Sequence, residues 1–84
     1  MNSKAQLTVE QQRLNEAMVV ANTENLKIAS EHIQTLLEEF PLFFQGWMEL
    51  GRMQRRRGKR KLALQSFESA RKIAPAHPIA AVES

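Results

Sequence analysis

The most chemically distinctive residues of this 84-residue chain are the basic side chains between positions 52 and 61. Seven of these ten residues are Arg or Lys, and none is acidic. Arginine presents a planar fork of N–H donors that binds carboxylates and phosphates through paired hydrogen bonds, and lysine adds a compact positive charge. The run therefore predicts a surface that recognises an anionic partner. Its basic members are Arg52, Arg55, Arg56, Arg57, Lys59, Arg60 and Lys61.

The basic run spans the expected end of one helix and the start of the next, and positive charge has opposite effects on stability at these two places. Positive charge is favourable at a helix C-terminus, which accounts in part for the three arginines that precede Gly58. The three basic residues after Gly58 lie at a helix start, where each costs roughly a few tenths of a kcal/mol. Local stability does not explain them, so we expect an acidic protein or peptide partner. A solvated, charged turn is the structural alternative.

Nucleic-acid binding through residues 52–61 is the alternative function, because the charge suits salt-dependent phosphate contacts. However, the chain has no tyrosine, and no aromatic residue is interleaved with the basic run. Stacking platforms and reading motifs of the usual kinds are therefore missing. Binding of any polyanion with uniform, steep salt dependence would favour this alternative, whereas dependence on peptide sequence would favour docking.

Enzyme chemistry has little support in the sequence. His32 and His77 are the only histidines, and cysteine and aspartate are absent. Glu38 and Glu39 are neighbours, so they point to different faces of a helix. A glycine-rich phosphate loop is also missing. We expect no catalytic residues, no metal site and no cofactor.

Length and composition indicate one small domain, because 84 residues can build only a modest core. The N-terminus lacks the apolar stretch of a signal peptide, and no apolar run reaches the roughly 18–20 residues that span a bilayer. We expect a cytoplasmic protein without a membrane segment. Residues 1–7 are expected to form a flexible N-terminus.

Apolar spacing of three and four residues predicts an all-α fold of four helices. Thr8, with Gln11 three places later, has the form of a capping box at the first helix. The second helix is expected from about Glu24 to Glu39, because Pro41 cannot continue it. The third is expected over 42–56 and the fourth over 59–73, before Pro75. Residues 78–84 are either a stub or the start of a short capping helix.

The sequence repeats itself with a period of about 34 residues, because this shift superposes Ala29 on Ala63 and Pro41 on Pro75. The second unit resembles the tetratricopeptide repeat pattern W-x2-L-G-x2-Y…A-x3-F…P, with Gln54 in the tyrosine slot as its one departure. The first unit resembles it less, since Arg13 replaces the tryptophan. The positions that carry the resemblance are Ala17, Ala29, Pro41, Trp47, Leu50, Gly51, Ala63, Phe67, Ala70 and Pro75.

The resemblance implies two antiparallel helical hairpins, repeat one over about 10–43 and repeat two over about 44–77, within a domain of residues 8–77. In this family the first helix of each hairpin lines a groove that holds a peptide. A carboxylate clamp of Lys and Asn is not expected, because Leu14 and Met18 occupy its positions. The implied groove residues are Gln11, Leu14, Asn15, Met18, Asn22, Gln45, Met48, Glu49, Arg52, Arg55 and Arg56.

Charge divides the chain into opposite halves. Residues 1–51 hold three basic and seven acidic side chains, a net charge of −4, whereas residues 52–84 hold nine basic and two acidic ones, a net charge of +7. This asymmetry permits self-association between the acidic second helix of one copy and the basic turn of another. Two repeats also leave an uncovered face. We therefore expect a docking module that is either the N-terminal domain of a larger protein or a self-associating adaptor.

Overall fold

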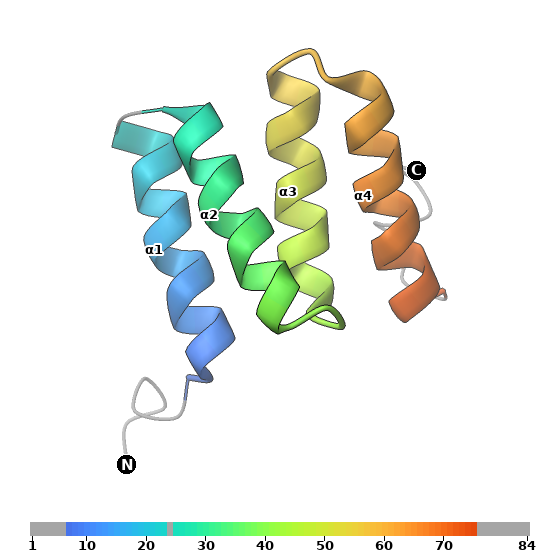
Figure 1. The fold of residues 1–84 in the computed structure, drawn as a ribbon, viewed down its shortest axis with the longest axis horizontal. Coiled ribbons are helices and arrows are strands. Elements are labelled where there is room, and N and C mark those ends of the chain that lie inside the picture. Colours follow the sequence, from blue (N-terminus) through green and yellow to red (C-terminus); the bar gives the residue numbers. More distant parts are fainter. Residues whose placement is uncertain (1–6, 24, 76–84) are drawn as a thin grey trace.

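The computed structural model describes residues 7–23 and 25–75. Within them the chain forms four α-helices and no strand: α1 (Val9–Thr23), α2 (Leu26–Glu39), α3 (Phe44–Arg56) and α4 (Arg60–Ile73) (Figure 1). Successive helices run antiparallel and lie side by side in chain order (Figure 1). The predicted all-α fold of helical hairpins is confirmed. The expected flexible N-terminus falls almost entirely, and the C-terminal stub or capping helix entirely, outside the described residues.

Side-chain caps explain where the first two helices begin. The Thr8 hydroxyl accepts a hydrogen bond from the Gln11 backbone N–H at 3.1 Å. The Gln11 amide donates to Asn15 instead of turning back, so only half of the predicted capping box forms. Asn25 caps α2, because its side-chain oxygen accepts from the Lys27 N–H at 2.7 Å. Helix α2 therefore begins after Asn25 and not at Glu24.

The third helix begins at Phe44, two residues later than the sequence predicted. Pro41 and Leu42 form a turn, closed by a hydrogen bond of 3.1 Å from the Phe43 N–H to the Phe40 carbonyl. The indole N–H of Trp47 donates to the Pro41 carbonyl at 2.8 Å. This bond ties the first turn of α3 to the connection between the hairpins.

The two hairpins repeat one another in backbone geometry as well as in sequence. Helix α4 occupies the same positions as α2, displaced by one repeat period. The bond from the Asn25 N–H to the Val20 carbonyl (3.3 Å) recurs at the equivalent place in the second unit, from the Lys59 N–H to the Gln54 carbonyl (2.8 Å). The chain thus builds the same helix-turn-helix unit twice.

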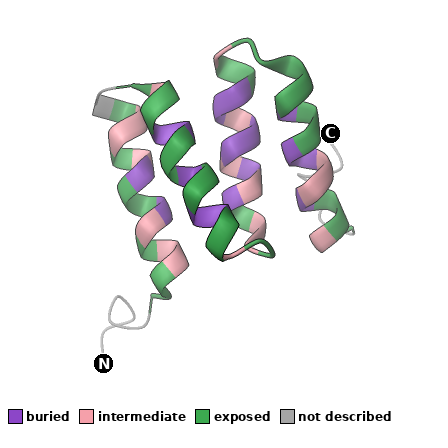
Figure 2. Ribbon diagram, viewed as in Figure 1, coloured by how far each residue is buried: buried purple, intermediate pink, exposed green. Residues whose placement is uncertain are grey.

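The core divides into two clusters, and the buried residues follow the inner sides of the helices (Figure 2). One joins α1, α2 and α3, and the other joins α3 to α4 around Phe67. Gly51 allows the second contact, because a Cβ at this position would lie 2.5 Å from Cε1 of Phe67. The buried apolar residues are Leu14, Ala17, Ala29, Ile33, Leu36, Leu37, Met48, Leu50, Met53, Ala63, Phe67 and Ala70.

Candidate functional site

The turn between α3 and α4 is a sharp, hydrogen-bonded helix end. Gly58 has φ +78°, a left-handed conformation that glycine adopts without steric cost. Its N–H donates to the Arg55 carbonyl at 3.0 Å, and the Lys59 N–H donates to the Gln54 carbonyl at 2.8 Å. These two bonds form a Schellman motif, which satisfies carbonyls at the end of α3. The backbone that carries the basic run is therefore held in one conformation.

A buried polar pair holds the two helices together beneath this turn. The Ser66 hydroxyl donates to Oε1 of Gln54 at 2.6 Å, and both residues are only 3% exposed. Gln54 stands in the tyrosine slot of the repeat pattern, where the sequence marked it only as a departure. Its partner on α4 was not predicted, because serine carries no distinguishing signal at that spacing. The bond fixes α3 against α4 close to the basic run.

Most of the basic run reaches solvent. Arg56, Lys59, Arg60 and Lys61 are exposed and Arg57 is half-buried. Within the described ranges these five side chains make no ion pair. We call this set, Arg56, Arg57, Lys59, Arg60 and Lys61, the basic turn. Like charges collected on one rigid turn repel one another and attract an anionic group.

Two other arginines of the run have internal contacts. Arg52 pairs with Glu49 on the same helix at 2.9 Å. The guanidinium of Arg55 lies 5.6 Å from the centre of the Phe67 ring, in a cation–π contact that covers this core residue. Arg52 is therefore held by a residue of α3 and Arg55 by a residue of α4, whereas the five side chains of the basic turn have no such ion pair or ring contact among the described residues.

The groove residues implied by the family resemblance divide into two groups. Leu14 and Met48 are each only 4% exposed and belong to the core, which corrects their assignment to a surface groove. One step along a helix turns a side chain by about 100°, so they face inward while their neighbours Asn15 and Glu49 face outward. The rest keep at least part of their surface: Gln11, Asn15, Met18, Asn22, Gln45, Glu49, Arg52, Arg55 and Arg56.

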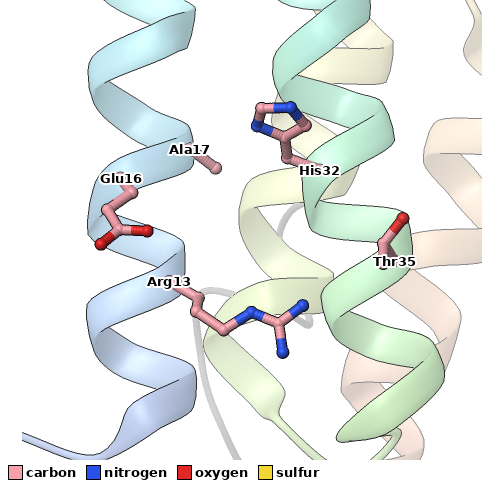
Figure 3. A pocket seen from close by; sticks show the side chains of 5 residues that line it. All are labelled: Arg13, Glu16, Ala17, His32 and Thr35. Atoms are coloured by element: carbon pink, nitrogen blue, oxygen red, sulfur yellow. The ribbon is translucent and has the colours of Figure 1, made fainter.

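A depression of about 190 Å³ lies between α1 and α2, where Figure 3 shows Arg13 and Glu16 from the first helix and His32 from the second. The guanidinium of Arg13 is held by Glu39, with Nη1 2.9 Å from Oε1. This hydrogen bond and the positive charge of Arg13 lower the pKa of the Glu39 carboxyl. In the same way, a hydrogen bond from Arg71 lowers the pKa of Glu68. The first pair joins α1 to α2, whereas the second lies within α4.

The comparisons with known proteins found no relative of this chain, because no protein-family model, no curated protein and no solved structure matches it. In the part of the chain that the structure describes, no helix is both long and apolar enough to cross a membrane. No three His or Glu side chains among the same residues lie close enough to hold a metal ion. The function is therefore inferred from the geometry of the described helices and turns.

Proposed function

We propose that this chain is a protein-docking module that binds an acidic segment of another protein through the basic turn. One observation carries the proposal: five cationic side chains stand on a hydrogen-bonded turn without an ion pair among the described residues. Neither helix capping nor internal pairing explains the three basic residues at the start of α4. Carboxylates of an acidic partner would pair with these cationic side chains.

The exposed face of α3 extends this surface away from the turn. Gln45 and Arg56 are exposed and Glu49 and Arg52 half-buried, at spacings of four and three that place all of them along one side of the helix. Amide and guanidinium groups on this side offer hydrogen bonds to a peptide backbone. The resemblance to tetratricopeptide repeats supports this use, since the first helix of each hairpin lines the ligand groove in that family.

The test measures binding of two labelled acidic peptides that have the same composition. In one peptide the glutamates are adjacent, and in the other they are evenly spaced. A compact cationic turn binds the clustered peptide more tightly, by about fivefold or more, because more charges meet at short range. Equal affinity for both peptides would contradict docking at this turn.

Matched variants locate the binding on the turn. Arg57→Gln combined with Lys61→Gln removes two charges from the basic turn and weakens binding about tenfold. Lys27→Gln combined with Lys72→Gln removes the same charge elsewhere and changes affinity by no more than about twofold. Equal losses in the two double variants would show that net charge alone drives binding.

Nucleic-acid binding is the second candidate, favoured only by the density of positive charge on the turn. A single-stranded RNA of the same net charge as the peptides tests it. The RNA would then bind at least as tightly as either peptide, and its affinity would fall steeply with salt concentration. Docking predicts that the clustered peptide competes away the RNA.

A further inference from the structure

In the first hairpin, one face of α2 is covered by the first helix of the next hairpin, α3. Helix α3 packs on that face: a Cβ at Gly46 would lie 2.9 Å from Cδ2 of Leu37, and the Ser30 hydroxyl lies 3.9 Å from the sulfur of Met53. Both Ser30 and Leu37 are buried by this contact. A single helix is thus enough to cover the face.

The equivalent face of the second hairpin has a different chemistry. Displaced by one repeat period, Ser30 becomes Leu64, and Leu37 becomes Arg71. Leu64 is 52% exposed, although it replaces a serine that is buried in the first hairpin. Ala21 of α1 likewise becomes Arg55 of α3. The second hairpin therefore presents an exposed leucine and Arg55 where the first presents a serine and an alanine, and its Arg71 is paired with Glu68.

Arg55 and Leu64 also help to line a depression of about 190 Å³ between the end of α3 and α4. Its lining consists of the exposed Arg55, Arg60 and Leu64 together with the buried Ala63 and Phe67. We call this surface the end face, made of the exposed Arg55, Arg60 and Leu64 over the buried Ala63 and Phe67.

We propose that the end face binds one amphipathic, acidic helix of a partner protein, with an apolar side chain against Leu64 and carboxylates against Arg55 and Arg60. This inference rests on the proposed docking function and specifies the form of its partner. In the first hairpin a helix, α3, already covers the equivalent face, and acidic residues on the flanks of the partner helix would match the charges of Arg55 and Arg60.

A solvated end cap accounts less well for this surface. A terminal repeat that faces only water is stabilised by polar residues on its outer side. Here the buried serine position of the first hairpin is filled by an exposed leucine, and α4 keeps Lys61, Gln65 and Lys72 for its solvent side. An exposed leucine beside two arginines offers an apolar contact and charges that orient a partner, which suits a binding surface.

The probe is a labelled, N-acetylated peptide of roughly 16 residues, a length at which an isolated helix becomes marginally stable. It carries leucine along one helical face and glutamate on both flanks. Fluorescence anisotropy measures its affinity for the full chain. Replacement of every glutamate by glutamine is expected to weaken binding about tenfold, and scrambling the order of residues by a similar factor. If the native chain does not bind the probe, the proposal is wrong.

Two exposed leucines of α4 supply a matched pair of variants. Leu64→Gln removes the centre of the end face and is expected to weaken probe binding about tenfold. Leu62→Gln makes the same change at a residue that is 44% exposed but lies outside the end face, and is expected to leave affinity within about twofold. Both positions are exposed, so both variants should fold. Equal affinity of the two variants would overturn the proposal.

The outcomes separate this inference from the docking function itself. If Arg57→Gln with Lys61→Gln abolishes probe binding and Leu64→Gln does not, the basic turn docks the partner and the end face does not. If Leu64→Gln abolishes it and the turn variant does not, the end face holds and docking at the turn fails. Dimers of the native chain that Leu64→Gln dissociates would identify a second copy as the occupant, which would also overturn the proposal.

Discussion

A buried hydrogen bond between Gln54 and Ser66 joins the two helices of the second hairpin. Both side chains are buried, and the Ser66 hydroxyl donates a hydrogen bond to the amide oxygen of Gln54. A buried acceptor that loses its donor keeps the full cost of its desolvation. The pair therefore contributes to the position of α4 relative to α3, and through it to the basic turn.

Removing one partner should cost more than removing both. Ser66→Ala leaves the Gln54 oxygen unsatisfied and is expected to lower the free energy of unfolding by about 1–3 kcal/mol, measured by urea denaturation. Gln54→Leu combined with Ser66→Ala replaces the pair by apolar groups and should recover most of that loss. If the double variant is less stable than the native chain by the sum of the losses measured for Ser66→Ala and Gln54→Leu alone, the bond does not couple these residues.

The ion pair of Arg13 and Glu39 should make a small, pH-dependent contribution to stability. The pKa of Glu39 is lower in the folded chain than in the unfolded chain. The contribution is thus present above the unfolded pKa and is lost as pH falls through the folded pKa. Arg13→Gln should lower the melting temperature by a few degrees at about pH 7 and by almost nothing at about pH 2.

The neighbouring carboxylate provides the control for this experiment. Glu39→Gln removes the partner of Arg13 and should reproduce the effect of Arg13→Gln at neutral pH. Glu38→Gln removes one charge at an exposed position beside it and should change the melting temperature less. A difference between Arg13→Gln and the native chain that persists unchanged in acid would show that packing, and not the ion pair, carries the effect.

At the scale of helices and turns, Gly58 sets the geometry of the candidate site. Its φ of +78° is unfavourable for a residue with a Cβ, although no atom lies near enough to obstruct one. Gly58→Ala should therefore lower the free energy of unfolding by about 1 kcal/mol through backbone strain alone. Gly58→Asn should cost less, because asparagine tolerates this conformation better. Equal stability of the alanine and asparagine variants in thermal unfolding would contradict the assignment.

The helices were predictable from the sequence, because their signals are local. Apolar spacing, Asn25 and Pro41 indicate the two turns of the first unit, and the repeat transfers them to the second. The start of α3 was misplaced because Leu42 follows the proline and suits a helix, whereas the chain still turns there.

Contacts between helices could not be predicted in the same way. Leu14 and Met48 were assigned to the groove from the family resemblance, whereas contacts between the helices bury both side chains. The Gln54–Ser66 bond needs the distance between two helices to be known. The 34-residue repeat pairs Ser30 with Leu64 in the sequence. Only the structure shows that α3 buries the face that holds Ser30, so the exposure of Leu64 could not be predicted.

The whole molecule is polarised along its sequence. The half up to residue 51 carries a net charge of −4 and the remainder +7, so the acidic hairpin precedes the basic one. The solvent-exposed acids of α2, Glu31, Glu38 and Glu39, lie on the opposite hairpin from the basic turn. Such a field draws an acidic partner towards α3 and α4 and orients it during approach.

The central claim is that the basic turn binds an acidic protein segment, and NMR titration tests it most directly. The isotope-labelled chain is titrated with the clustered acidic peptide, and light scattering confirms that it does not self-associate in the same samples. We predict that backbone amide shifts concentrate between residues 55 and 64, with those of α1 and α2 nearly unchanged. Shifts centred on α1 and α2, or none at saturating peptide, would contradict the account.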